Sequence, residues 1–172
     1  MTERMAAALA AAESARADLI AVVSPLDEAA LTRRQSPAWT PLEVLEHLRL
    51  SEENIVRLLA HRLMRAREQG LTPGAPAPEL DKDSVFLADV SADSPEILIP
   101  QAGLSRDGVL AGLSKTRDAL RALCTEVDAF DGTKVVARHI VLGEIHFYRW
   151  IHFIGAHEAR HRRQIGRILG SA

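Results

Sequence analysis

The segment from Thr40 to Gly70 carries the clearest helix signals in the chain, and these signals restrict what the chain can fold into. In "WTPLEVLEHL", Thr40 is a good N-cap, Pro41 suits the first helical position, and Glu43 completes a capping box. Gly70 is a natural C-terminal stop. Apolar residues recur between these signals at helical spacing, at Val44, Leu48, Ile55, Leu58 and Leu59. The pattern predicts a long amphipathic helix over 40–70.

Three further stretches have the same helical character, and few segments resemble strands. They span about 2–24, which ends before Pro25, about 105–129, and about 143–169. Their apolar faces are formed by Leu9, Ile20 and Val23, by Val109, Leu110, Leu113, Leu120, Leu123 and Val127, and by Phe147, Trp150, Ile154, Ile165 and Ile168. No internal repeat is visible.

The connection between the second and third predicted helices is long and rich in Pro, Asp and Ser, "LTPGAPAPELDKDSVFLADVSADSPEILIPQAG". It is too long for a tight helix–helix turn. A crossover of this length lets the third helix run parallel to the second. The sequence therefore predicts an all-α four-helix bundle with one long crossover, folded as a single domain over 1–172.

Composition limits the class of partner. The net charge of −2 gives no reason to expect nucleic acid or an anionic membrane as a partner. The N-terminal segment carries Glu3, Glu13, Arg16 and Asp18, so it does not resemble a signal peptide or a membrane helix. Cys124 is the single cysteine, which excludes an intrachain disulfide and fits a reducing cytoplasm.

The segment "HEARH", His157 to His161, spells the zinc-protease pattern H-E-x-x-H. Histidines at i and i+4 project from one face of a helix and can bind one metal ion together. Both lie along the apolar stripe marked by Ile154 and Ile165, where an imidazole needs a partner. The alternative is a pair of core histidines hydrogen-bonded to neighbouring side chains.

A protease is the least favoured interpretation of this segment. Residues 162–172 follow the motif and include no His, Asp, Glu or Cys, whereas zinc proteases need further groups downstream. Glu158 is about 100° of helix away from His157. We expect it to pair with Arg162 on the surface and to be incidental to the site.

A third ligand must come from upstream, and His47 is the leading candidate. It lies about 10 Å from the start of its helix, and His161 lies about 12 Å from the end of the fourth helix. If these two helices are antiparallel neighbours, the three histidines meet at one height. We expect structural roles for the remaining histidines, His61, His139, His146 and His152. Three histidines with an open position are typical of a catalytic site, and this ligand set suits Zn while leaving Ni and Fe open.

Together these features resemble the DinB/YfiT family of metal-binding four-helix bundles. The matching segments are "WTPLEVLEHL", with Trp39 and His47, and "LGEIHFYRWIHFIGAHEARHRRQI", with Trp150, His157, His161 and Gln164. The resemblance extends over the whole chain in helix order and length. It implies an up-down-down-up bundle, a homodimer, and a divalent metal ion, often Zn or Ni, held by His47, His157 and His161.

Some members of the family are thiol-dependent transferases or isomerases that use bacillithiol, mycothiol or glutathione, and others are described as metal-dependent hydrolases. The resemblance thus favours a cytoplasmic metal-dependent enzyme that transfers a low-molecular-weight thiol onto a small electrophilic substrate. Two alternatives remain open, a non-catalytic metal-binding module of a stress response and a hydrolase. The hydrolase is weakened because its best candidate base, Glu53, points away from His47 on the helix.

Two other groups of residues bear on thiol chemistry. Cys124 lies in mid-helix among leucines, so we expect a buried core residue and not a nucleophile. A set of arginines on the fourth helix either attracts an anionic thiol or forms a solvated face near the helix end, and the second interpretation is preferred. This set comprises Arg160, Arg162, Arg163 and Arg167.

Overall fold

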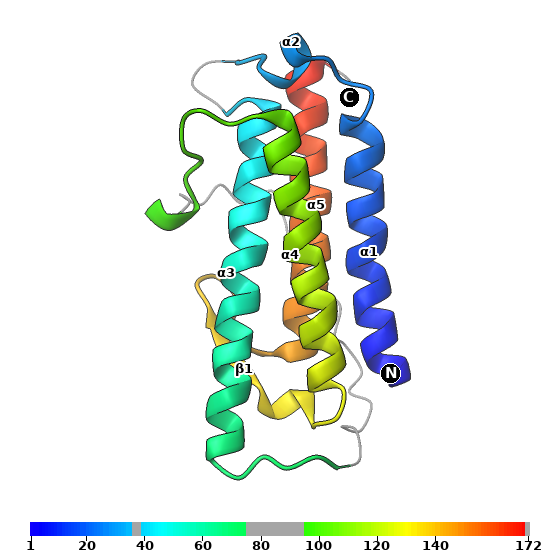
Figure 1. Ribbon diagram of the computed structural model, residues 1–172, viewed down its shortest axis with the longest axis vertical. Helices are drawn as coiled ribbons and strands as arrows, with labels where there is room; N and C mark the ends of the chain where they lie inside the picture. The colour runs from blue at the N-terminus through cyan, green and yellow to red at the C-terminus, as the bar shows by residue number, and fades with distance from the viewer. Residues whose placement is uncertain (36–38, 75–94, 171–172) are drawn as a thin grey trace.

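The computed structural model of the chain describes residues 1–35, 39–74 and 95–170, and within them it confirms the predicted four-helix bundle (Figure 1). None of the helices in these described ranges is both long and apolar enough to cross a membrane. The elements are α1 (Glu3–Val23), α2 (Glu28–Leu31), α3 (Pro41–Glu68), η1 (Glu96–Leu98), α4 (Arg106–Val127), η2 (Gly132–Lys134), β1 (Val136–His139), β2 (Gly143–His146) and α5 (Phe147–Leu169).

The long helices α1 and α5 run in one direction, and α3 and α4 run in the opposite direction (Figure 1). Helix α1 packs along α5, α3 packs along α4, and α3 also contacts α5. Helices α3 and α5 are therefore antiparallel neighbours, as the height argument for the histidines requires. Most of the predicted crossover, residues 75–94, lies outside the described residues.

Capping interactions fix the helix ends. The capping box that begins α3 is present, since the Thr40 side chain accepts from the Glu43 N–H and the Glu43 carboxylate accepts from the Thr40 N–H. Thr2 caps α1 and donates from its backbone N–H and its hydroxyl to Asp128, at 2.9 and 2.6 Å. Because Asp128 is the C-cap of α4, these bonds tie the start of α1 to the end of α4.

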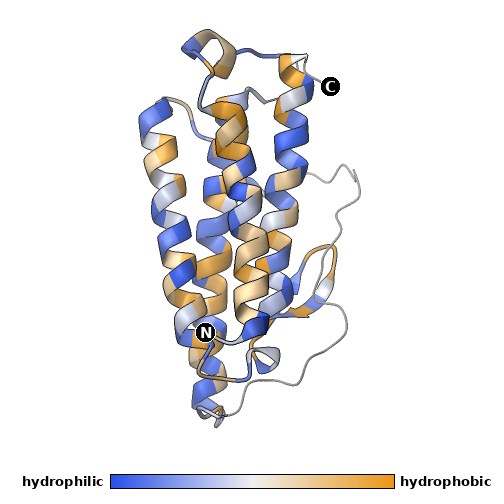
Figure 2. Cartoon of the chain, turned by 90° about the vertical axis from the view of Figure 1, so that its right-hand side faces the viewer, coloured by the Kyte–Doolittle hydropathy of each residue, from blue (hydrophilic) through white to orange (hydrophobic). Residues whose placement is uncertain are grey.

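The predicted start of the fourth helix is wrong. Residues 136–139 and 143–146 pair as an antiparallel hairpin, and α5 begins only at Phe147. Gly143 has a φ of 71°, a left-handed conformation that suits a hairpin turn and not a helix start. The Trp150 indole N–H donates to the Ala137 carbonyl at 3.3 Å and holds the hairpin on α5. Figure 2 shows the hairpin standing beside the bundle.

The apolar core is divided into two clusters by a polar layer. One cluster fills the end of the bundle near the start of α1, and the other fills the opposite end. The layer between them contains buried polar side chains from all four long helices. These are Arg16, Ser51, Glu52, Thr116, Arg117, Glu158 and His161, with His47 nearby.

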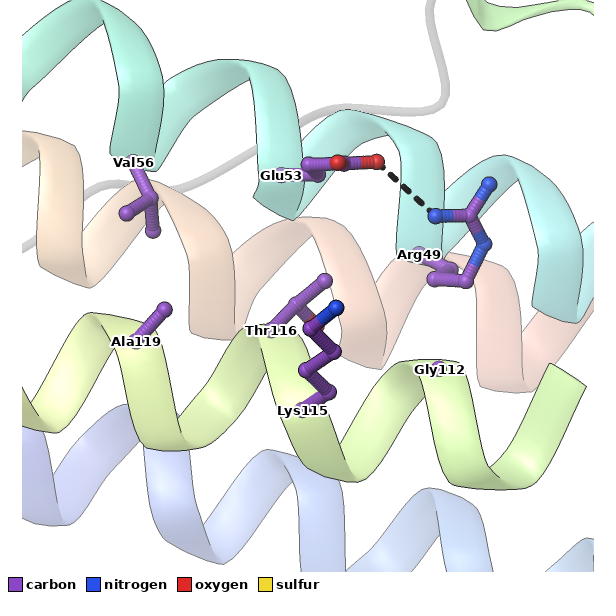
Figure 3. Close-up of a pocket in the computed structure, with 7 residues that line it drawn as sticks. All are labelled: Arg49, Glu53, Val56, Gly112, Lys115, Thr116 and Ala119. Carbon is purple, nitrogen blue, oxygen red and sulfur yellow. Dashed lines mark hydrogen bonds and ion pairs between the residues drawn. The ribbon is translucent and has the colours of Figure 1, made fainter.

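Replacement by alanine is expected to affect the free energy of unfolding differently at two helical glycines, Gly155 and Gly112. A Cβ at Gly155 would lie 3.2 Å from the backbone of Ala11 and Ala12 in α1, which cannot yield easily. A Cβ at Gly112 would come within 2.3 Å of the Arg49 side chain, which lies over it in Figure 3 and must move aside, as a flexible side chain can and a helix backbone cannot. We expect Gly155→Ala to lower the free energy of unfolding by up to about 2 kcal/mol. Gly112→Ala should change it by less, or raise it by up to about 1 kcal/mol through helix propensity.

Urea unfolding followed by circular dichroism measures both variants. Each variant serves as the control for the other, because both gain the same helix propensity. Equal stability changes in the two variants would show that α1 and α5 can move apart at no cost in stability. That result would contradict the close packing of Gly155 against α1.

Candidate metal centre

His47 lies on α3 with only 3% of its surface exposed. Its Nδ1–H donates to the carbonyl oxygen of Leu98 in η1, at 3.0 Å. In the neutral ring this bond places the proton on Nδ1 and leaves a lone pair on Nε2. Leu98 thus sets both the orientation of the His47 ring and the nitrogen that is available as a ligand.

His157 and His161 lie one turn apart on α5, and their rings face His47. The Nε2 of His157 is 3.4 Å from the Nε2 of His47 and 3.0 Å from the Nε2 of His161. The Nδ1–H of His161 donates to Oε1 of Gln164 at 2.6 Å, so this ring also presents Nε2 as an acceptor. The structure therefore brings the three predicted ligands together, all with Nε2 toward a common point.

This donor set fits a divalent metal ion. The ligand atoms of the three histidines all lie within 4.8 Å of one another. Tetrahedral zinc with Zn–N bonds of 2.0–2.1 Å separates its ligand nitrogens by about 3.3 Å, close to the two Nε2 distances above. The Nε2 atoms of His47 and His161 both present lone pairs to the cluster. A proton on Nε2 of His157 can donate a hydrogen bond to only one of them. A cation bound between the rings would satisfy all three.

Burial prepares the three rings for this role. It lowers the pKa of His47 and of His161, the latter to about 4, and it lowers the pKa of His157 well below its ordinary value. The positive charge of Arg160 lowers the pKa of all three further. The imidazoles are thus neutral at pH 7, which is the form that binds metal.

Aromatic side chains surround the cluster. The ring of Trp39 lies 4.9 Å from that of His47, and Phe153 is stacked on His157 with centroids 5.4 Å apart and planes 14° apart. An apolar shell of this kind limits the access of water to a metal site and lowers the local dielectric constant.

The expectation for Glu158 is wrong. Its side chain does not pair with Arg162 on the surface but is 2% exposed, with Oε1 accepting from Arg16 and Arg117 at 2.8 and 3.0 Å. The residues next to Glu158 do not predict these partners, because the two arginines come from α1 and α4, far away in the chain. Glu158 is thus paired with two arginines and is not part of the cluster of His47, His157 and His161, so it does not stand where the base of a zinc protease acts.

The other histidines lie outside the cluster of three that the described residues form. His61 is exposed. His139 caps the hairpin turn, since its Nδ1 accepts from the N–H groups of Val141 and Leu142, both at 3.1 Å. His146 is the N-cap of α5, where its side chain accepts from the Arg149 N–H.

Neighbouring charged groups confirm some expectations and correct others. Glu53 is half-buried and pairs with Arg49 and Arg57, so it points away from the histidines as expected. Among the described residues, no carboxylate joins the three histidines in the cluster. Of the four arginines on the predicted solvated face, Arg163 and Arg167 are exposed, whereas Arg160 and Arg162 are half-buried.

A small pocket lies elsewhere on the bundle, between α3 and α4 (Figure 3). Its volume is about 160 Å³, and none of the three clustered histidines lines it. The lining residues are Arg49, Glu53, Val56, Gly112, Lys115, Thr116 and Ala119. Arg49 spans its rim and is paired with Glu46 and Glu53, so its charge is already neutralised.

Cys124 is fully buried in α4, as expected for a core residue. Burial raises the pKa of its thiol to about 12. We therefore expect the thiol to remain protonated at pH 8 and to resist 5,5′-dithiobis(2-nitrobenzoic acid) in the folded protein. Labelling should become complete when the chain is unfolded in guanidinium. Fast labelling of the folded protein, at the rate seen for the unfolded chain, would contradict the buried position.

Comparison with known proteins agrees with the fold. No curated protein matches the sequence. Among solved structures, the crystal structure of TT2238, a four-helix bundle protein, is similar with a TM-score of 0.65 and 24% sequence identity. The similarity covers 95% of this chain and 98% of that one, and at this identity it supports the fold alone. The sequence profile of the DinB superfamily matches residues 11–165, nearly the whole bundle. The chain therefore belongs to the DinB superfamily.

Proposed function

We propose that His47, His157 and His161 hold one divalent metal ion, Zn or Ni, and that the protein is a metal-dependent enzyme of the thiol-transferase type. The observation that carries the proposal is the convergence of three Nε2 atoms in a buried site. The Nδ1 bonds of His47 and His161 to Leu98 and Gln164 support it, since metal-binding histidines are usually oriented in this way.

The arrangement favours a catalytic over a purely structural role. Three protein ligands leave a fourth position open, whereas structural zinc sites use four protein ligands. When bound, the metal would supply a Lewis acid that lowers the pKa of a thiol in that position. Trp39 and Phe153 would exclude water from the same space.

The thiol would come from a small molecule. Cys124, the single cysteine, is buried and protonated and is not part of the cluster. Low-molecular-weight thiols such as glutathione, mycothiol and bacillithiol carry carboxylates or other polar groups. The charge of Arg160, which acts on all three histidines, would favour an anionic co-substrate.

A conjugation assay tests this function. The protein, first stripped with a chelator and then loaded with Zn²⁺ or Ni²⁺, is incubated with each of the three thiols and 1-chloro-2,4-dinitrobenzene. We expect metal-dependent formation of the conjugate with at least one thiol, and its loss in His161→Ala. His61→Ala is the matched control, because His61 is exposed on α3 and outside the cluster.

The outcomes separate the alternatives. Metal binding without turnover of any thiol would favour the non-catalytic metal-binding module. Metal-dependent cleavage of p-nitrophenyl acetate without thiol transfer would favour the hydrolase, although the described cluster offers no carboxylate as a base. Wild-type protein that binds no metal would refute all three functions.

A further inference from the structure

Four buried charges form a closed ring in the polar layer of the bundle, one from each long helix. Arg16 of α1 contacts Glu158 at 2.8 Å and Glu52 at 2.5 Å. Arg117 of α4 contacts the same two carboxylates, Glu52 at 2.7 Å and Glu158 at 3.0 Å. We call Arg16, Glu52, Arg117 and Glu158 the four-charge ring.

The remaining donors of the ring are also satisfied. Arg16 donates to the carbonyl of Leu113, and Arg117 donates to the carbonyl of Ala12. The hydroxyl of Thr116 donates to Glu52 at 2.8 Å. Each residue of the ring has 7% or less of its surface exposed. Both arginines reach Glu158 through Oε1, while its buried Oε2 has no hydrogen-bond partner among the described residues. The other contacts hold the charges in one geometry.

Burying such a ring costs desolvation free energy, and apolar residues of similar size usually stabilise a core as well or better. The ring is therefore better explained by a role in specifying how the helices are aligned. The ring separates the two apolar clusters, so it fixes which turn of each helix lies level with the others. On each helix it lies in the interval between the two clusters, at Ala12–Leu19, Leu48–Ile55, Leu113–Leu120 and Ile154–Ile165.

The ring carboxylates come from the two helices that carry the histidines. Glu52 is on α3, five residues after His47, and Glu158 is on α5, between His157 and His161. Each arginine contacts one carboxylate from α3 and one from α5. A rotation of α5 by one residue, about 100°, would break two contacts of the ring and turn His157 away from His47.

We propose that the four-charge ring is a positioning device for the histidine cluster, in which Arg16 and Arg117 fix the height and rotation of α3 and α5 so that the three Nε2 atoms converge before any metal binds. The biological role of this device rests on the proposed metal-binding function. Its test does not, because the geometry of the three histidines can be measured in the metal-free protein.

Arg16→Lys is the sharpest variant. Lysine keeps the charge but lacks the planar fork with which Arg16 reaches both carboxylates. Thr116→Val is a milder second variant that removes one hydrogen bond to Glu52 and keeps all four charges. Leu120→Ala is the control, since Leu120 is fully buried in α4 one turn from the ring and its loss lowers stability without touching a charge.

The first measurement uses metal-free protein. Long-range ¹H–¹⁵N spectra of the histidine rings report which nitrogen carries the proton. In wild type we expect His47 and His161 as Nδ1–H tautomers, following their bonds to Leu98 and Gln164. In Arg16→Lys we expect a mixture of tautomers, with a smaller change in Thr116→Val, whereas Leu120→Ala should keep the wild-type pattern.

The second measurement is the affinity for Co²⁺ and its d–d absorption spectrum. Loss of an outer positioning contact typically lowers metal affinity about 10- to 100-fold, and we expect this for Arg16→Lys with an altered spectrum. Wild-type tautomers in both ring variants would overturn the positioning role, as would equal tautomer changes in Leu120→Ala. Wild-type protein without affinity for Co²⁺ would instead refute the proposed function, and the tautomers would still decide the role of the ring.

Discussion

His47→Ala is expected to lower zinc affinity by about 100- to 1000-fold. Zinc binding at a structural site with four protein ligands contributes roughly 10–16 kcal/mol, which is about 2.5–4 kcal/mol per ligand, and the loss of one histidine of that strength lowers affinity by about two to three orders of magnitude. His47 is the only proposed ligand on α3, and its loss leaves two histidines on one helix. Wild-type protein should hold about one divalent ion per chain by elemental analysis, and the variant should lose most of it. Competition with a chromophoric chelator gives the two dissociation constants.

His61→Ala is the control for this change. It removes the same side chain from the same helix, at an exposed position outside the cluster. We expect its zinc affinity to equal that of wild type. Full retention of zinc by His47→Ala would exclude the proposed ligand set, and equal losses in both variants would point to weak, scattered binding by histidines in general.

Local patterns predicted the parts of the fold that local forces determine. The capping box at Thr40 and Glu43 is visible in ten residues of sequence and is present in the structure. The placement of His47 level with His161 followed from 1.5 Å per residue along two helices, with one assumption about their direction. The structure brings these rings together, while metal binding by them stays a prediction.

Features that depend on distant partners were missed. Glu158 was expected on the surface because its nearest cation in sequence is Arg162, whereas its actual partners lie 142 and 41 residues away. The hairpin was missed because each of its strands has only four residues, too few for a clear alternation. A charged residue on an apolar stripe was the one available signal, and Arg117 among the leucines of α4 is such a residue.

Arg117→Met is expected to lower the free energy of unfolding by about 3–5 kcal/mol, the effect typical of removing one partner from a buried ion pair. Arg117 is 2% exposed, and its removal leaves Glu52 and Glu158 with Arg16 as their shared counter-charge. Arg121→Met is the matched control. Arg121 lies one turn further along α4, pairs with Glu13 and Asp118, and has a half-exposed side chain, so its removal should change stability by less than about 1 kcal/mol.

A double-mutant cycle shows whether the loss comes from the ring itself. Arg117→Met combined with Glu52→Met removes two charges that are in contact at 2.7 Å and leaves the Arg16–Glu158 pair intact. The double variant should therefore be more stable than the sum of the two single losses predicts, by about 1 kcal/mol or more. Urea unfolding of the four proteins at one pH gives this coupling energy. Strict additivity would mean that Arg117 and Glu52 act independently, and a ring of independent charges could not set the relative heights of α3 and α4.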